Sequence, residues 1–107
     1  MANLKLTTAR VLVLRAFLED PERERYGLDL ALEAGIEPGT IYPILVAFEN
    51  AGWLESSQED IDPHAEGRPR RRYYVLTAAG VTAARDAVLR AEQRRGRRSA
   101  TSRRLAW

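Results

Sequence analysis

The chain lacks cysteine, so it can form no disulfide framework and offers no thiolate for chemistry. No apolar run approaches the ~20 residues of a membrane-spanning helix, and the opening MANLKLTTAR lacks the apolar middle region of a secretory signal. Histidine occurs only once, as His64. The lack of cysteine, of a membrane span and of a secretory signal favours a reducing, cytoplasmic location.

Residues suited to catalysis are equally scarce. His64 lies in a polar turn region near Asp60, Asp62 and Glu66. One imidazole among scattered carboxylates makes neither a good metal site nor a catalytic triad, and no glycine-rich phosphate loop followed by Lys-Ser/Thr occurs. We therefore expect no catalytic residues, no metal and no cofactor.

The charge of the chain is divided sharply along its length. The net charge is +2 over 107 residues. Residues 1–66 hold 5 basic and 13 acidic residues, a net charge of −8, whereas residues 67–107 hold 12 basic and 2 acidic residues, a net charge of +10. A basic module of this kind usually binds a polyanion. For the arginines of residues 94–104 a solvated surface is the alternative.

The first two expected helices are residues 7–18 and 26–34. Thr7 or Thr8 can cap the first, and the sequence Asp20-Pro21 ends it. In the second, Leu28 with Leu32 and Ala31 with Ala34 give an apolar side. Gly35 is the expected C-terminal cap, and the polar run PERER is expected to connect the two helices.

The third expected helix is residues 40–51. Ile41, Leu45 and Phe48 follow helical spacing and predict its buried face. Pro43 lies near the first turn, where a proline costs few backbone hydrogen bonds. The expected exposed side at the start of the helix carries the residues that we predict to contact DNA bases, which are Gly39, Thr40, Tyr42 and Pro43. The alternative is that Tyr42 covers the core and Thr40 only caps the helix.

A β-hairpin is expected next. WLESS at residues 53–57 and RRYYVLT at residues 71–77 are predicted strands, with a polar turn region between them, and Trp53 is expected in the core. Four arginines accumulate beside the second strand: Arg68, Arg70, Arg71 and Arg72. A buried strand could not hold that charge, so we expect the arginines at the tip of the hairpin, where they would meet phosphates or a minor groove.

Thr77 is the expected cap of a fourth helix that ends near Arg95. The helix carries an apolar seam that we expect a monomer to leave unburied, so we predict a dimer contact through Val81, Ala84, Val88 and Ala91. A chain of this size has a small core and often gains stability by oligomerising. Residues 96–107 are predicted to be a basic, flexible tail.

Three helices, a basic hairpin and a final helix predict a mainly α fold with a small β-hairpin (α+β), a winged helix-turn-helix followed by a dimerisation helix. The expected parts are a DNA-binding domain at 1–77, a dimerisation helix at 78–95 and a tail at 96–107. The turn GIEPG joins the second and third helices and would hold the third helix out toward base edges.

The stretches YGLDLALEAG, GTIYPIL, ENAGWL and GRPRRRYYVLTAAG, with their spacing, resemble the PadR family of transcriptional regulators over roughly residues 6–95. The resemblance implies a homodimeric repressor that binds inverted-repeat operators in double-stranded DNA. It places the helix with Gly39, Thr40, Tyr42 and Pro43 in the major groove and the wing arginines on the backbone or in the minor groove. In some relatives a small, often aromatic effector binds near the dimer interface.

The sequence departs from this family in two respects. Relatives often carry a basic residue near the positions of Val46 and Ala47, whereas the third helix here contains neither Lys nor Arg and carries Glu49. Phosphate anchoring would then fall on the wing and the N-terminus of this helix, with Lys5, Arg10 or the tail as further candidates. The chain also ends soon after the fourth helix, so we expect an effector either to bind between subunits or to be absent. A ligand-sensing receptor and a protein-interaction module on the same scaffold are the alternatives to a DNA-binding repressor.

Overall fold

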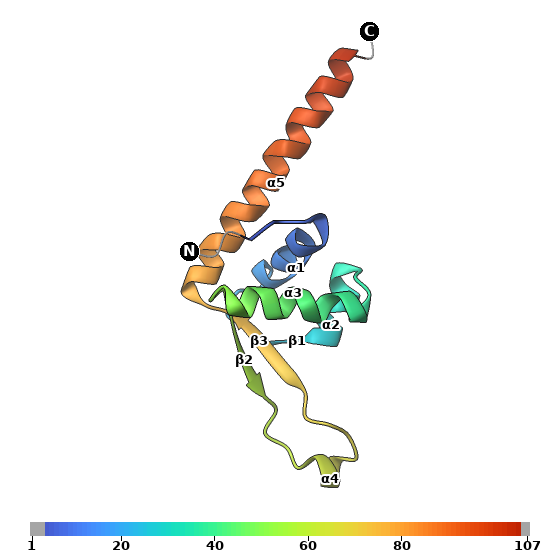
Figure 1. Cartoon of the computed structure of the whole chain (residues 1–107), viewed down its shortest axis with the longest axis vertical. Coiled ribbons are helices and arrows are strands. Elements are labelled where there is room, and N and C mark those ends of the chain that lie inside the picture. Colours follow the sequence, from blue (N-terminus) through green and yellow to red (C-terminus); the bar gives the residue numbers. More distant parts are fainter. Residues whose placement is uncertain (1–3, 106–107) are drawn as a thin grey trace.

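The computed structural model describes the backbone of residues 4–105 and the side chains of residues 4–98. Trp107, for which the sequence favours neither a free nor a docked position, lies outside the described residues. Five helices and three strands follow one another in the order α1 (Thr8–Leu18), β1 (Arg25–Tyr26), α2 (Gly27–Ala34), α3 (Pro38–Asn50), β2 (Leu54–Gln58), α4 (Pro63–Glu66), β3 (Arg72–Leu76) and α5 (Ala78–Leu105) within this part (Figure 1).

The molecule is elongated, with extents of 66 × 27 × 21 Å. Helices α1, α2 and α3 form the central body, the β2–β3 hairpin extends from it in one direction, and α5 extends in the other (Figure 1). This arrangement confirms the predicted mainly α fold with a small antiparallel sheet, a winged helix-turn-helix followed by a long helix.

The sheet is antiparallel with the strand order β1-β3-β2. In the hairpin Leu54 lies opposite Leu76, which puts both on the buried face, and Gln58 lies opposite Arg72 at the outer end. The hairpin was predicted, whereas β1 was not. Strand β1 is only two residues long within a polar run, and its extended geometry depends on pairing with β3.

Helix α3 supplies the centre of the core. Ile41, Leu45 and Phe48 are fully buried, as the spacing predicts. The helix begins at Pro38, two residues before the predicted start, because proline suits the first helical position. Gly35 ends α2 in the left-handed conformation (φ 70°), and the N–H of Ile36 donates to the carbonyl oxygen of Ala31 at 2.8 Å.

The predicted apolar side of α2 is confirmed at Ala31, which is buried, and is wrong at Leu28 and Leu32. Leu32 is 74% exposed and Leu28 is 38% exposed, whereas Leu30 and Ala31 are buried. A helix of eight residues has too few turns for its apolar residues to define one face, so packing against α1 and α3 decides which side is buried.

The start of α5 is fixed to the end of α3. The Thr77 hydroxyl accepts a hydrogen bond from the N–H of Gly80 at 2.9 Å, as the predicted cap requires, and donates to the carbonyl oxygen of Gly52 at 2.7 Å. Trp53, between these turns, packs against the core and stacks on Phe48 with ring centroids 5.4 Å apart.

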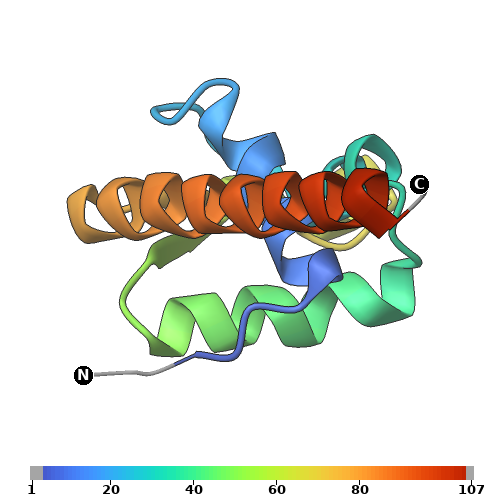
Figure 2. The ribbon, with the colours of Figure 1, turned by 90° about the horizontal axis from the view of Figure 1, so that it is seen from above.

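The apolar seam of α5 is buried within the chain itself, which corrects the premise of the predicted dimer contact. Ala84 is fully buried, and Val81 and Val88 are partly buried against the same core. Helix α5 crosses α1 (Figure 2), and the seam packs in one core cluster with buried residues of α1. A monomer therefore buries most of what the sequence suggested it could not.

Helix α5 also runs ten residues past its predicted end near Arg95, to Leu105. The segment after Arg95 contains no proline, and its arginines and alanine are good helix formers, so the single Gly96 does not end the helix. The flexibility of residues 96–107 and the division of the chain into three parts stay predictions.

Candidate nucleic-acid interface

Helix α3 presents an uncharged face to solvent at its N-terminal half. Gly39, Thr40 and Pro43 are exposed, and Val46 is 49% exposed. The buried residues of the same helix hold this face outward, and α2 packs beside α3 in helix-turn-helix fashion. The face offers a hydroxyl, exposed backbone and apolar groups, which are groups that contact base edges and thymine methyl groups.

Tyr42 has a double role in this geometry. Its side chain is 43% exposed, and its ring lies over the start of α2, where a Cβ on Gly27 would approach the ring carbon Cε1 to 3.0 Å. The ring therefore packs on the backbone of Gly27 while leaving part of its surface to solvent.

The wing is the β2–β3 hairpin with its connecting loop, residues 54–76. Its tip is formed by the short helix α4 and not by the arginines (Figure 1). Asp62 caps this helix, because its Oδ1 accepts a hydrogen bond from the N–H of His64 at 3.0 Å. The arginines from Arg68 to Arg72 follow α4 on the path back to β3, which corrects their predicted place at the tip. The Asp-Pro pair at residues 62–63 is a helix-start signal that the sequence interpretation missed.

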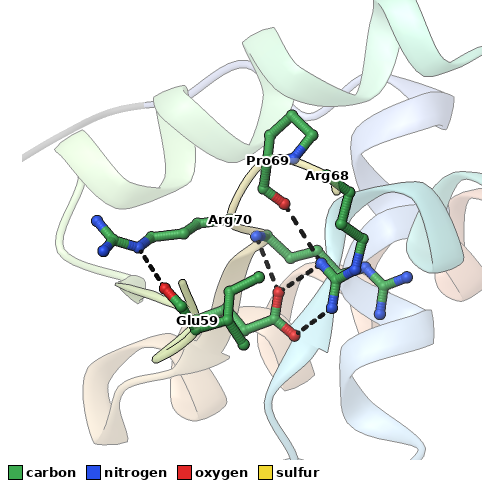
Figure 3. Close-up of polar contacts among 6 residues, drawn as sticks. Glu59, Arg68, Pro69 and Arg70 are labelled. Atoms are coloured by element: carbon green, nitrogen blue, oxygen red, sulfur yellow. Dashed lines mark hydrogen bonds and ion pairs between the residues drawn. The ribbon is translucent and has the colours of Figure 1, made fainter. Parts of the chain in front are cut away.

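Arg68 pairs with Glu59 across the base of the wing loop, residues 60–70 (Figure 3). Its Nη1 lies 2.7 Å from Glu59 Oε1 and its Nη2 lies 3.0 Å from Oε2, a bidentate pair. The backbone N–H of Arg71 donates to Glu59 Oε1 at 3.2 Å. The Arg68 hydrogen bonds lower the pKa of Glu59 from its ordinary 4.5 to about 2, and the same pair raises the pKa of Arg68.

The side chains of Arg70 and Arg71 make fewer hydrogen bonds than that of Arg68. Arg70 donates only through Nε, to the carbonyl oxygen of Ile61 at 3.0 Å, and the end of its guanidinium points away from that bond (Figure 3). The Cζ of Arg71 lies 5.0 Å from the centroid of the Tyr26 ring, a cation–π contact. Tyr26 in turn packs on Tyr73, with centroids 6.1 Å apart. Tyr73 thus anchors the strand behind the arginines.

Arg72 connects the wing to α3. Its Nη1 donates to the Ser56 hydroxyl at 2.7 Å, and that hydroxyl donates to the Glu49 carboxylate. Glu49 therefore has a partner inside the protein and is not simply a negative charge facing DNA. The register that aligns Ser56 with Tyr74 places this chain of bonds on the face of the hairpin that turns toward α3. Neither Glu49 nor Ser56 was singled out as a functional residue, because their pairing depends on strand register.

Tyr74, the second tyrosine of the hairpin, is buried at 3% exposure, so it belongs to the core. Desolvation by burial raises its pKa above the ordinary value. The side chain lies opposite Ser56 in the hairpin and joins β3 to the hydrophobic core.

A basic groove lies on the opposite side of the molecule from the wing. It encloses about 580 Å³ between the N-terminal segment, α1 and the outer half of α5. Leu4, Leu6 and Leu12 line it on one side and Ala91 on the other. Its cations are Lys5, Arg15, Arg90, Arg94, Arg95 and Arg98. Ala91 is the one member of the predicted dimer seam that reaches this groove.

Within the described residues, no three His, Cys, Asp or Glu side chains are grouped so that they could hold a metal ion. In the same part of the chain, none of the helices combines the length and the apolar character that a membrane span requires.

The profile of the Transcriptional regulator PadR-like family matches residues 17–86. This match covers α2, α3, the wing and the start of α5, and so includes all the predicted DNA-contacting residues. The search of curated proteins gives no match.

Solved structures show the same fold. A PadR family transcription regulator from hypervirulent Clostridium difficile R20291 aligns with a TM-score of 0.63 at 21% identity, over 92% of this chain and 99% of that one. BpsR of Bordetella bronchiseptica aligns with a TM-score of 0.68 at 22% identity, over 87% of this chain and 64% of that one. A possible transcriptional regulator from Methanosarcina mazei Go1 aligns with a TM-score of 0.61 at 19% identity, over 94% of this chain and 78% of that one. The chain thus spans less than two thirds of BpsR.

Proposed function

The chain belongs to the PadR-like family of transcriptional regulators, and we propose that it is a homodimeric repressor that binds an inverted-repeat operator in double-stranded DNA. The observation that carries this proposal is the juxtaposition of two surfaces. An exposed, uncharged face of α3 lies beside a wing rich in arginine, and the two are joined by the Arg72–Ser56–Glu49 chain. One surface suits base contacts and the other suits phosphates.

We assign base contacts to the start of α3. Thr40 is the strongest candidate, because its hydroxyl is exposed, and Gly39 and Pro43 allow close approach of the backbone. Tyr42 contributes its exposed edge, and its packing on Gly27 restricts the ring before DNA arrives. A side chain that is already ordered loses less conformational entropy on binding.

We assign phosphate contacts to Arg70 and Arg71, whose guanidinium groups keep free donors in the structure. Arg68 and Arg72 are committed to Glu59 and Ser56. They add to the positive field of the wing, and their main role is to hold its shape.

We place the dimer contact on the exposed side of α5 around Leu89, together with the groove against α1. Leu89 is 54% exposed and Leu12 is 39% exposed, so both are available to a partner, unlike Ala84. Two copies related by a two-fold axis would present their α3 helices to half-sites ~34 Å apart or a multiple of that distance.

A ligand-sensing regulator is the second candidate, and the groove favours it. The DNA binding of BpsR is regulated by 6-hydroxynicotinic acid. The transcriptional regulator PcaV from Streptomyces coelicolor was solved in complex with its natural ligand. In this chain the leucines and arginines of the groove suit a small aromatic anion. Quenching of tryptophan fluorescence by such compounds, coupled to loss of DNA binding, would support this role.

Binding to a mixed pool of duplex DNA, titrated in salt and followed by sequencing of the bound fraction, tests the proposal. Enrichment of an inverted repeat together with a steep salt dependence would establish a dimeric, sequence-reading regulator. Steep salt dependence without an enriched motif would show phosphate binding only. Absence of binding at low salt would favour a protein-interaction module instead.

A further inference from the structure

The loop at the end of the wing, residues 60–70, is closed at its base by one acidic residue. The backbone N–H of Glu59 donates to the carbonyl oxygen of Arg71 at 2.8 Å, which continues the hairpin ladder past its last paired residues. The Glu59 carboxylate accepts three more bonds, two from Arg68 and one from the N–H of Arg71. Every bond that Glu59 makes therefore joins the two sides of the loop (Figure 3).

The pair is sheltered compared with the rest of the loop. The Glu59 side chain is 17% exposed and that of Arg68 is 33% exposed, whereas Arg70 is exposed. A bidentate pair with partial burial holds its geometry better than an exposed ion pair does. Arg68 Nη1 also reaches the carbonyl oxygen of Pro69 at 3.3 Å, so the guanidinium bridges the turn that leads to Arg70.

We propose that Glu59 is a positioning residue of the DNA interface, because its pair with Arg68 latches the wing loop so that Arg70 and Arg71 are already placed for phosphates. Arg68 is the second half of the latch and not a phosphate ligand. This inference rests on the proposed function. Its physical basis is preorganisation: a loop that is closed in the free protein does not have to be ordered when DNA binds.

The latch and charge repulsion alone predict opposite effects of Glu59→Gln on DNA affinity. Removing a carboxylate near DNA normally strengthens binding, because it removes repulsion from phosphates. Under the latch, Glu59→Gln weakens binding by about 3- to 10-fold, since the loop must then be ordered on DNA. The matched control is Asp60→Asn, which removes the same charge from the exposed neighbouring residue and should bind as well as wild type or better.

A double-mutant cycle with Arg68→Gln tests the pairing. We expect each single variant to weaken DNA binding and the double variant to bind no more weakly than either. The salt slope is the slope of log K for DNA binding against log salt concentration, and for Arg68→Gln it should differ from that of wild type by less than ~1. Hydrogen exchange of the free proteins should show faster exchange of the amides in residues 60–70 in both single variants. Thermal unfolding of each variant confirms that the body stays folded.

The opposite pattern would overturn the proposal. If Glu59→Gln bound DNA more tightly with a steeper salt slope, and Arg68→Gln lowered the slope by ~1, Arg68 would be a phosphate ligand that Glu59 masks. Failure of wild type to bind DNA at low salt would remove the proposed function, and with it the positioning role. Normal wild-type binding with unchanged Glu59→Gln binding would remove the positioning role alone.

Discussion

Gly80 of α5 packs directly against the carbonyl group of Trp53, and a Cβ at position 80 would lie 2.0 Å from that oxygen. The contact joins the first turn of α5 to the turn between α3 and β2. Substitution Gly80→Ala forces the helix start away from this turn, and we expect it to lower the free energy of unfolding by about 3 kcal/mol or more.

The matched control for this prediction is Gly96→Ala, in the same helix but with open space around the added Cβ. Alanine is the better helix former, so Gly96→Ala should leave stability unchanged or raise it by up to ~1 kcal/mol. Urea unfolding of both variants measures the difference. Equal stabilities of the two variants would mean that the helix start shifts at little cost.

Thr77→Ala should lower the free energy of unfolding by about 1–2 kcal/mol, because the Thr77 hydroxyl both caps α5 and donates to Gly52. Thr82→Ala is the comparison. Thr82 is exposed in the same helix, and its hydroxyl only reaches back to Ala78 at 3.4 Å, so this variant should stay within about 0.5 kcal/mol of wild type. Thermal unfolding of the two threonine variants gives the answer.

Arg25→Met should destabilise the fold by about 2–4 kcal/mol. Arg25 is 4% exposed, donates to the carbonyl oxygen of Ala16 at 2.8 Å, and pairs with Glu33. Its burial lowers its pKa from the ordinary value, and its removal leaves the Ala16 carbonyl and Glu33 without this partner. Arg23→Met, an exposed change two residues away, should have a small effect in the same urea experiment. Similar losses in both would contradict a structural role for Arg25.

The contribution of Glu59 to stability should depend on pH with a definite sign. Arg68 lowers the pKa of Glu59 to about 2 in the folded chain, below the ordinary 4.5. The stabilisation is therefore complete above about pH 4.5 and is lost as pH falls toward 2. Carboxyl NMR titration should report the low pKa in wild type and a return toward 4.5 in Arg68→Gln. An unchanged pKa in that variant would contradict the pairing.

Arg70 and Thr40 should differ in how their loss affects DNA binding. Arg70→Ala should weaken binding to all sequences and lower the salt slope by ~1, because it removes one phosphate contact. Thr40→Val should change the preference between sites and leave the slope nearly unchanged. Titration of both variants against selected and random duplexes at several salt concentrations separates the two effects. Identical behaviour would contradict this division of roles.

Local rules account for what the sequence predicted well. The spacing of Ile41, Leu45 and Phe48 requires only the helical period, and all three are buried. The caps at Thr7, Gly35 and Thr77 follow from residue chemistry at helix ends, and each serves as a cap in the structure. The winged-helix fold class and the order of its main elements, without β1 and α4, followed from these signals.

Contacts between distant residues explain what the sequence missed. Arg25 belongs to a polar run, and nothing local indicates that β1 pairs with β3 and buries its side chain. The arginines of the wing are one cluster in the sequence, yet the folded hairpin pairs Arg68 with Glu59 and Arg72 with Ser56, whereas Arg70 donates only to the carbonyl oxygen of Ile61.

The sequence by itself determined helices α1, α2, α3 and the start of α5, the hairpin, the charge division and the resemblance to the PadR family, because periodicity, capping and residue type act over a few positions. Only the tertiary structure decided how those elements use their surfaces. The seam around Ala84 has the spacing of a dimer contact, but α1 covers it within the chain. An apolar stripe specifies that a helix must be buried and does not specify against what, since the hydrophobic effect has no direction.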